Sequence, residues 1–353
     1  MISVKNTKPG TPSPVCPMHF FDYELPDRLI AQEPAAERDA ARLLVIHRQP
    51  QTFEHRTVRD LPDLLTPGDL IVFNDTKVIP ARLIGCRTET GGKWECLFVR
   101  ECESGEWEVM SQTRGYAKVG ETFRTDTGLT LELTGRTADK HWLIKPHAPG
   151  NAHELLAKFG HIPLPPYIRK GRSHEGDDER YQTVYAEQAG SVAAPTAGLH
   201  FTPGVLKRLA ERGIDTARVT LHVGLGTFAP VKTDDSTQHA IHGEWCEVTQ
   251  PTLDAIQRTK TNGGRVIAIG TTTTRTLETA KGRPFRGESK LFIHPPYDFN
   301  VITGLMTNFH LPRTTLLLLV QAFAGTDLLK RAYEEAIRQE YRFYSYGDAM
   351  LIL

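Results

Sequence analysis

Two different patterns of hydrophobic and polar positions divide the chain. Between about residues 69 and 145, apolar and polar residues alternate in short stretches broken by glycine and aspartate. The clearest stretches contain Trp94, Cys96 and Phe98, then Trp107 and Val109, and then Leu129, Leu131 and Leu133. Because successive side chains of a strand point to opposite faces, this alternation predicts strands with one buried face. Several such strands at close spacing predict a small antiparallel β-barrel.

The second pattern begins after residue 147 and is typical of an α/β layer. Buried strands are predicted at 219–223 and 265–269, and helices at 203–212, 252–261, 272–281, 312–324 and 326–340. Strands that alternate with helices favour a sheet covered by helices. Residues 28–65 mix strand and helix patterns and are expected to join this layer, which makes the barrel an insertion.

These patterns give a division of the chain into domains. Residues 1–18 are polar and proline-rich, which predicts a disordered lead-in. Residues 19–67 and 148–353 are expected to form the α/β domain, and residues 68–147 the inserted barrel.

Charge and cysteine content narrow the functional classes. Lys plus Arg equals Asp plus Glu, 42 of each, so no overall field attracts a polyanion, and a nucleic-acid partner needs a local basic patch. The five cysteines match no zinc spacing, which favours reduced cysteines in a cytoplasmic protein. The first 18 residues lack the apolar core of a signal peptide, and no apolar run has the length of a membrane span.

Candidate chemistry begins with a stretch of small residues at 190–202. Small residues such as Gly198, beside the hydroxyl of Thr196, let a ligand approach the backbone closely, and His200 is suited to proton transfer. A tight loop before a helix, with His200 as a cap, explains the same residues.

A second stretch, 221–230, is a strand that runs into a Gly-x-Gly turn formed by Gly224 and Gly226 and followed by Thr227. Ligands of open α/β sheets bind at this end of a strand. His222 lies inside the strand and is a second proton-transfer candidate, although a strand histidine is more often a hydrogen-bonded core residue.

Two further stretches are polar where a plain core would be apolar. At 267–278 a buried strand ends at Gly270 and a helix begins among threonines, so Thr271, Thr272 and Arg275 suit a carboxylate or a phosphate. The alternative is a threonine-capped helix, and the ending of a P-loop is absent. At 306–312, Asn308 and His310 alternate before a proline, and a structural role explains them equally well.

Other polar residues are weaker candidates. Asn74 and Asp75 end a predicted strand, where an Asx turn explains them, yet Asp75 and Arg82 are also placed to face a cleft between the domains. His239, His242 and Glu244 have a spacing that resembles a metal site but lack a third ligand at helical spacing, so we expect no metal.

A short basic run follows Tyr167. Its residues Arg169, Lys170 and Arg172 are candidates for phosphate contact, with Tyr167 beside them for base stacking. A solvated loop is the alternative.

Taken together, these stretches resemble the S-adenosylmethionine:tRNA ribosyltransferase-isomerase family of queuosine synthesis. The resemblance includes residues 193–202 (Ala-Ala-Pro-Thr-Ala-Gly-Leu-His-Phe-Thr) and 307–312 (Thr-Asn-Phe-His-Leu-Pro). The other matching segments are 21–32, 68–82, 163–168, 180–185, 220–228, 270–272 and 341–349. The resemblance therefore runs from about residue 19 to the C-terminus.

The resemblance implies an α/β/α layered domain with an inserted Greek-key-like β-barrel, in a monomeric cytoplasmic enzyme without a metal. It implies that S-adenosylmethionine gives up its ribosyl group to the 7-aminomethyl-7-deazaguanine base in a tRNA anticodon. The product is epoxyqueuosine-tRNA, and adenine and methionine are released.

The implied reaction assigns tasks to the candidate residues. Proton transfer falls to His200, His222 and His310, and contact with the acceptor amine to Asp75 or Glu244. The methionine end is expected at Thr271, Thr272 and Arg275, and Asn308 and Tyr181 are expected to read adenine or the deazaguanine. The remaining substrate-contact candidates are Asn74, Arg82, Thr196, Gly198, Gly224, Gly226 and Thr227, and the tRNA contacts are Arg169, Lys170 and Arg172.

Two rival functions stay open at this point. A methyltransferase, suggested by the Gly224-x-Gly226 turn, would form S-adenosylhomocysteine instead of adenine. A tRNA-binding module without chemistry would release nothing, although histidines in polar loops are not what phosphate binding requires.

Overall fold

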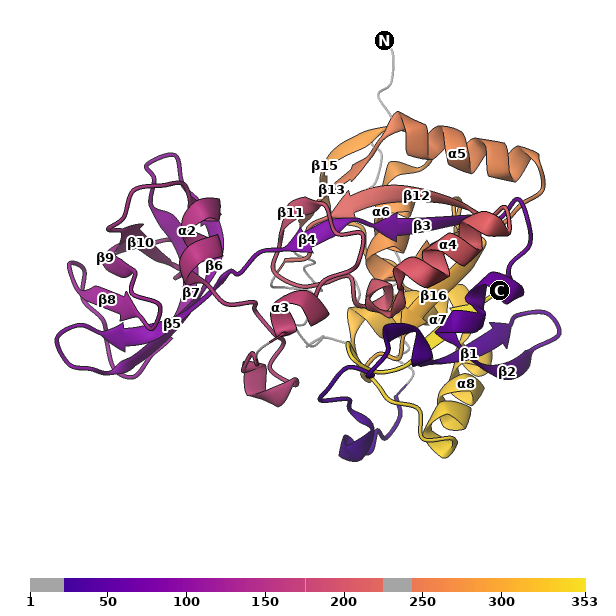
Figure 1. The fold of residues 1–353 in the computed structure, drawn as a ribbon, viewed down its shortest axis with the longest axis horizontal. Coiled ribbons are helices and arrows are strands. Elements are labelled where there is room, and N and C mark those ends of the chain that lie inside the picture. Colours follow the sequence, from indigo (N-terminus) through magenta and orange to yellow (C-terminus); the bar gives the residue numbers. More distant parts are fainter. Residues whose placement is uncertain (1–21, 175, 225–242) are drawn as a thin grey trace, which may run out of the picture.

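The two hydrophobic patterns correspond to two structural units, a large layered unit and a smaller barrel at one end of the molecule (Figure 1). The structure is a computed structural model that describes residues 22–174, 176–224 and 243–353. The expected lead-in 1–18 and the candidates Gly226, Thr227, His239 and His242 lie outside the described residues.

A nine-stranded mixed sheet forms the centre of the large unit. In spatial order its strands are β15 (Phe285–Ser289), β13 (Glu244–Val248), β12 (Asp215–Leu221), β3 (Leu70–Asn74), β14 (Val266–Ile269), β16 (Gly304–Asn308), β17 (Ala349–Ile352), β1 (Arg42–His47) and β2 (Thr52–Thr57). The four central strands β12, β3, β14 and β16 are parallel to one another. Their carboxyl ends therefore lie along the same edge of the sheet.

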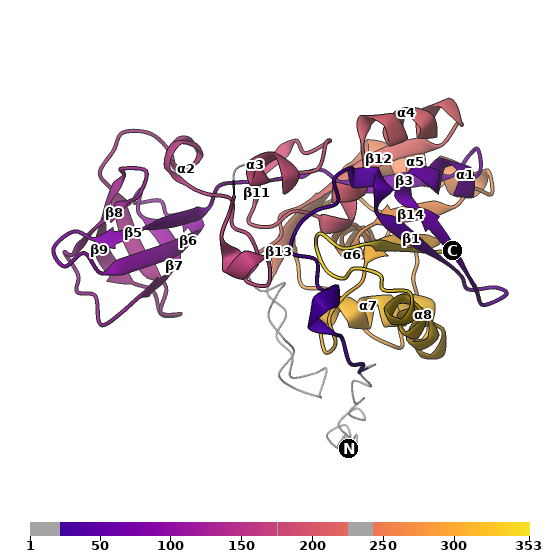
Figure 2. The same ribbon diagram turned by 60° about the horizontal axis from the view of Figure 1, so that its bottom comes forward.

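Helices cover both faces of this sheet, as Figure 2 shows for α4 on one side and α7 and α8 on the other. One face packs against α5 (Gln250–Thr261), α6 (Thr271–Ala280), α7 (Thr315–Ala324) and α8 (Thr326–Arg338). The other packs against α1 (Leu61–Leu64), α4 (Pro203–Glu211) and the 3₁₀-helix η5 (Thr196–His200). The alternation within β3 explains the two cores, because Leu70 and Val72 face the first set of helices and Ile71 and Phe73 the second. The α/β/α architecture is confirmed.

The small unit is a closed six-stranded antiparallel barrel. Its strands are β5 (Arg82–Arg87), β6 (Lys93–Glu101), β7 (Trp107–Thr113), β8 (Thr122–Thr125), β9 (Thr130–Arg136) and β10 (Trp142–Pro146). After the consecutive strands β5, β6 and β7, strand β8 returns to pair with β5, which is the Greek-key connection. The alternating residues Trp94, Cys96 and Phe98 are buried inside the barrel as predicted.

Both ends of the barrel differ from the predicted boundaries of 68 and 147. Residues 70–74 form β3 of the large sheet, because this run is apolar on both faces, as in a buried parallel strand. At the other end, α2 (Ala152–Phe159) places Leu155 and Leu156 in the core of the barrel. The barrel strands start at Arg82, and the barrel core extends into α2.

Short elements connect the two units. The parallel pair β4 (Thr76–Val78) and β11 (Gln188–Ser191) lies between the sheet and the barrel (Figure 1). The short helix α3 (Asp177–Arg180) lies near this pair. The remaining 3₁₀-helices are η1 (Asp27–Leu29), η2 (Arg38–Ala40), η3 (Val58–Asp60) and η4 (Arg169–Gly171).

The predicted helices are present, with small shifts at their ends. Helix α7 begins at Thr315 rather than Pro312, because the Thr314 side chain accepts a hydrogen bond from the Leu317 amide and caps the helix there. Among the described helices, none has the length and apolar character needed to cross a lipid bilayer.

Candidate active site

A cavity of about 360 Å³ lies at the carboxyl edge of the central strands. All four polar stretches identified in the sequence contribute to its lining, with residues 194–197, Val223, 270–272, and 307, 308 and 310–312. They meet because three of the stretches follow the parallel strands β12, β14 and β16, whose ends lie side by side. Clefts at this edge are the usual ligand sites of α/β sheets, and the volume suits a small molecule.

Thr196 and Asn308 face one another in the cavity wall. The Thr196 hydroxyl donates to Asn308 Oδ1 at 2.9 Å, and Asn308 Nδ2 donates to the Tyr344 carbonyl at 3.1 Å. Asn308 is buried, so these two bonds fix the orientation of its amide. The site therefore holds one amide in a defined position at the cavity surface.

His310 lines the same cavity and is held as a neutral imidazole. Its Nε2 lies 2.9 Å from Thr307 Oγ1. Burial lowers the pKa of His310 from the ordinary 6.5 to about 3, because water cannot solvate the charged ring. Near neutral pH, His310 can therefore accept or donate one hydrogen bond on each ring nitrogen but carries no charge.

The first turn of α6 contributes Thr271 and Thr272 to the cavity. The helix begins directly after Gly270, whose φ of 88° turns the chain out of β14. The next two threonines are buried, and the Thr273 and Thr274 hydroxyls donate to carbonyls one turn back. The run of threonines thus divides into two that face the cavity and two that support the helix start.

The Asn74 side chain is hydrogen-bonded to the first turn of α6. Its Nδ2 donates to Thr272 Oγ1 at 3.2 Å and to the Leu221 carbonyl at 3.0 Å, and its Oδ1 accepts from the Leu221 amide. Asn74 is not among the residues that line the cavity and contacts Thr272 instead, and its contact with substrate stays a prediction.

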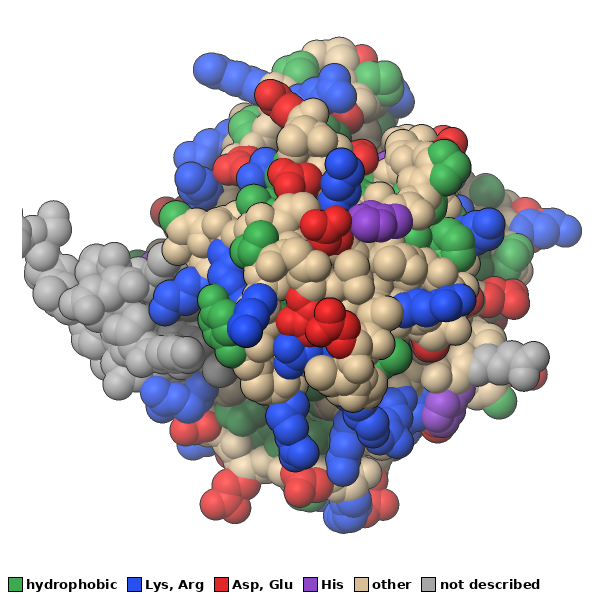
Figure 3. All heavy atoms as spheres, turned by 90° about the vertical axis from the view of Figure 1, so that its left-hand side faces the viewer, with side chains coloured by type: hydrophobic (Ala, Val, Ile, Leu, Met, Phe, Trp, Pro, Cys, Tyr) green, Lys and Arg blue, Asp and Glu red, His purple; other side chains and the backbone are tan. Residues whose placement is uncertain are grey.

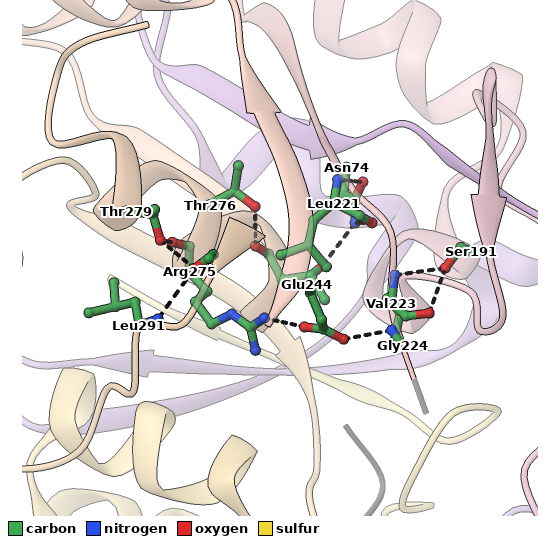
Figure 4. A network of polar contacts seen from close by, with 12 residues as sticks. Asn74, Ser191, Leu221, Val223, Gly224, Glu244, Arg275, Thr276, Thr279 and Leu291 are labelled. Atoms are coloured by element: carbon green, nitrogen blue, oxygen red, sulfur yellow. Dashed lines mark hydrogen bonds and ion pairs between the residues drawn. The ribbon is translucent and has the colours of Figure 1, made fainter. Parts of the chain in front are cut away.

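A buried ion pair lies next to the cavity (Figure 4). Glu244 is only 4% exposed, and its Oε2 contacts Nη2 of Arg275 while its Oε1 accepts from the Gly224 amide at 2.7 Å. These two side chains line a smaller cavity that shares Thr271, Thr272 and Leu316 with the main one. The two spaces are therefore neighbours along α6.

Two of the three predicted proton-transfer histidines are directed elsewhere. The His200 ring nitrogens lie 3.1 Å from the Ala197 carbonyl and 3.0 Å from the Gly347 carbonyl, and His200 lines a different small cavity. The His222 ring stacks on Trp245 and its Nδ1 lies 2.8 Å from Thr76 Oγ1. Burial lowers the pKa of His222, with a smaller contribution from His153.

Asp75 is also absent from the cavity lining. Its Oδ1 accepts a hydrogen bond from the Thr220 hydroxyl at 2.7 Å, and burial raises the pKa of Asp75. This carboxyl joins β3 to β12 rather than facing the cavity.

Three other predicted contacts have structural partners instead. Tyr181 is fully buried and packs edge-on against Tyr346. Gly198 leaves no room for a side chain, because a Cβ there would lie 2.1 Å from the Tyr185 hydroxyl. Arg82 donates to the Gly171 carbonyl and pairs with Glu95, so it ties the barrel to the following loop.

The basic run contains one partly buried cation and two exposed ones. Arg169 is 12% exposed and forms ion pairs with Glu33 and Asp177. Lys170 and Arg172 are exposed to solvent. Seen from the barrel end, basic and acidic side chains are interspersed rather than gathered into one basic face (Figure 3).

Two tyrosines form an aromatic wall of the cavity; Tyr167 was expected from the sequence to stack on a base, whereas Tyr344 was not identified. Tyr167 and Tyr344 pack with ring centroids 4.1 Å apart, and the Tyr167 hydroxyl lies 2.5 Å from Ser345 Oγ. Burial raises the pKa of both tyrosines, so both are neutral near pH 7. The segments 163–168 and 341–349, which carry part of the family resemblance, were the available signal for these residues.

A larger and more open depression of about 770 Å³ lies on the barrel. The charged residues that line this depression are Lys93, Glu95, Arg124 and Asp126. Among the described residues, no histidine lines it. No group of three His, Cys, Asp or Glu residues is arranged to hold a metal ion within the described ranges.

A layered α/β domain with a Greek-key insertion and a ligand-sized cavity at its strand ends places this protein among the α/β enzymes that bind a small molecule. The model of the queuosine biosynthesis protein family matches residues 18–352. The S-adenosylmethionine:tRNA ribosyltransferase-isomerase of Symbiobacterium thermophilum is 49% identical, over 94% of this chain and 98% of that protein. The protein of the same name from Thermotoga maritima is 47% identical with the same coverage.

A solved structure gives the same result. The crystal structure of S-adenosylmethionine tRNA ribosyltransferase from Thermotoga maritima matches 94% of this chain and 99% of that chain, with 38% identity and a TM-score of 0.54. The chain belongs to the queuosine biosynthesis protein family. The resemblance found in the sequence is confirmed, and so is the prediction of an enzyme.

Proposed function

We propose that this protein transfers and isomerises the ribosyl group of S-adenosylmethionine onto the 7-aminomethyl-7-deazaguanine base of a tRNA anticodon. The product is epoxyqueuosine-tRNA, and adenine and methionine leave. The observation that carries the proposal is the convergence of four polar stretches on one cavity of about 360 Å³. The names of the relatives support the donor and the tRNA acceptor.

The chemistry requires proton transfers and the ordering of two substrates. The sulfonium acidifies protons on the adjoining ribose carbon, adenine needs a proton to leave, and the acceptor amine must be neutral to attack. General acid–base groups contribute about 10²–10⁴-fold to such steps. Holding both substrates in place contributes on the order of 7–11 kcal/mol.

His310 is our candidate for contact with the reacting groups, because it alone among His200, His222 and His310 lines the cavity. Its low pKa suits a neutral hydrogen-bonding partner near pH 7. The geometry gives no support to proton transfer by His200 or His222, whose rings face other partners.

The polar groups of the wall suit the two ends of S-adenosylmethionine. We assign the fixed amide of Asn308, with Thr196 behind it, to the adenine base, and the packed pair of Tyr167 and Tyr344 to one of its ring faces. Thr271, Thr272 and the backbone amides of the first α6 turn suit the methionine carboxylate. Asp75 is not expected to touch the acceptor amine.

We assign tRNA phosphate contact to Lys170 and Arg172, the two exposed cations of the basic run. Arg169 instead holds the loop through Glu33 and Asp177. We further propose that the enzyme acts in the cytoplasm as a monomer and uses no metal.

Product analysis tests the proposal directly. The protein is incubated with S-adenosylmethionine and tRNA bearing the aminomethyl-deazaguanine, and tRNA with unmodified guanine serves as the control. We expect free adenine, free methionine and a nucleoside heavier by the ribosyl-derived ring, only with the modified tRNA. S-adenosylhomocysteine would indicate a methyltransferase, and tRNA binding without products would indicate a binding module; either result refutes the proposal.

A further inference from the structure

The ion pair of Glu244 and Arg275 is unusual in its placement. The side chains are 4% and 14% exposed, and they lie beside the cavity rather than in the core of the sheet. A buried pair of this kind adds little to stability compared with apolar residues of similar size. Stability alone therefore does not explain why the pair lies beside the cavity, and its contacts there do.

The pair is attached to the cavity through α6. Arg275 follows Thr271 and Thr272 by one helical turn, so the three residues share a face of the helix. Side chains of a helix point toward its N-terminus, which directs Arg275 back toward the cavity-lining threonines. The amide of Gly224, which belongs to the second polar stretch, donates to Glu244 from the other side (Figure 4).

One atom of the pair still offers a donor. Among the described residues, the buried Nε of Arg275 has no hydrogen-bond partner. A buried donor without a partner destabilises the protein, and a ligand oxygen that accepts from it would remove this cost. The small cavity has a volume of only about 30 Å³ and is also lined by Leu291, Leu316 and Leu319, of which Leu316 lines the main cavity as well.

A fixed cation, a fixed anion and an apolar wall match one chemical group, an α-amino acid at the end of a short aliphatic chain. We propose that, at the wall shared by the two cavities, Arg275 binds the α-carboxylate and Glu244 the α-ammonium of the donor substrate, while Leu316 contacts the methylene groups next to its sulfonium. The pair thereby selects S-adenosylmethionine over sulfonium nucleosides that lack either charge. This assignment rests on the proposed function. It adds Arg275, already expected at the methionine end, to Thr271 and Thr272 as a contact of the carboxylate, and it moves Glu244 from the acceptor amine to the donor.

The test measures binding rather than turnover. Calorimetry compares S-adenosylmethionine with its decarboxylated analogue, which lacks the carboxylate, and with its deaminated analogue, which lacks the ammonium. Wild-type protein is expected to bind each analogue at least about tenfold more weakly, since each loses a charged hydrogen bond. Equal binding of all three ligands would overturn the proposal without any variant.

Two variants separate the roles of the charges. Arg275→Lys should weaken S-adenosylmethionine and the deaminated analogue but leave the decarboxylated analogue nearly unchanged. Glu244→Gln should weaken S-adenosylmethionine and the decarboxylated analogue but not the deaminated one. If either variant weakens all three ligands by the same factor, the pair acts only on structure and the proposal is wrong.

The ion pair of Asp69 and Arg265 provides a matched control. Asp69 is 1% exposed and is hydrogen-bonded to Arg265, and the two residues precede β3 and β14 at the sheet edge opposite the cavity. Asp69→Asn is expected to lower stability while leaving the ratios among the three ligands unchanged. If Glu244→Gln does not fold, the wild-type comparison and Arg275→Lys still decide.

Failure of this inference differs from failure of the proposed function. Wild-type protein that releases adenine in the presence of tRNA but binds the three ligands equally would refute only the role of the pair. Selective binding of S-adenosylmethionine without adenine release would refute the reaction and leave the role of the pair intact.

Discussion

The Thr196 hydroxyl donates a hydrogen bond to Asn308 Oδ1 at 2.9 Å, and so joins the start of η5 to the end of β16, 112 residues apart in the sequence. Thr196→Val removes the donor and keeps the shape of the side chain. We expect kcat/KM for S-adenosylmethionine to fall by roughly tenfold, because an unpaired amide oxygen costs about 1–3 kcal/mol and Asn308 loses its fixed orientation.

Thr134→Val is the control for this change. Thr134 lies in the barrel and donates to the Leu143 carbonyl at 3.0 Å, so it loses a similar bond away from the cavity. Steady-state kinetics should show no change in this variant. Equal losses in both variants would contradict a specific role for Thr196.

The low pKa of His310 predicts a pH-dependent stability. The unfolded chain binds a proton at His310 below about pH 6.5, whereas the folded ring stays neutral down to about pH 3. Folded protein should therefore lose stability as the pH falls below 6.5, with a limiting slope of about 1.4 kcal/mol per pH unit from this group. Urea unfolding of wild type and His310→Gln between pH 7.5 and 4.5 measures it. The variant should lose less stability over this range, and identical pH dependence would contradict the neutral buried ring.

Gly190 and His222 are packed so closely that a methyl group does not fit. A Cβ at Gly190, where φ is 151°, would lie 2.8 Å from His222 Nε2. Gly190→Ala is expected to destabilise the protein by about 1–3 kcal/mol through overpacking. Adding His222→Ala should recover part of this loss, so the two changes should not be additive.

Gly287→Ala separates the backbone effect from the clash. Gly287 has a similar φ of 155°, but the nearest atom to a Cβ there is 3.7 Å away. Thermal unfolding should show a smaller loss for this variant than for Gly190→Ala. A loss of the same size would place the whole cost in the backbone.

The basic run predicts two different responses to mutation. Replacing Lys170 and Arg172 by alanine should weaken tRNA binding and reduce its salt dependence, by about 0.7 in the slope of log K against log salt for each phosphate that is no longer neutralised. Arg169→Ala should instead lower stability, because it leaves Asp177 buried without its partner. Filter binding of tRNA at several salt concentrations measures the first response, and thermal unfolding measures the second. An unchanged salt slope in the double variant would remove these residues from the tRNA surface.

Much of the fold followed from hydrophobic periodicity. The alternation of Trp94, Cys96 and Phe98 predicted a barrel strand, and the helices were placed to within a few residues. The strand at 70–74 was assigned to the wrong unit, because a short apolar run does not reveal which sheet it joins. Only the pairing of β3 with β12 and β14 shows this.

The site was predicted at the level of loops but less well at the level of side chains. That the stretches at 193–202, 221–228, 270–275 and 307–312 meet follows from strand order, and the structure brings the described parts of these stretches together. Periodicity does not give the direction of a side chain in an irregular loop. His200 and His310 therefore looked equivalent in the sequence, although only His310 lines the cavity.

The central claim is that this cavity holds S-adenosylmethionine, and a crystal structure of the protein with S-adenosylmethionine tests it most directly. We expect density for the nucleoside in the cavity, against Asn308 and the ring of Tyr344, with the amino acid end directed along α6 toward Arg275. Density in the open depression of the barrel, beside Trp94 and Lys93, with none in the cavity, would contradict the account.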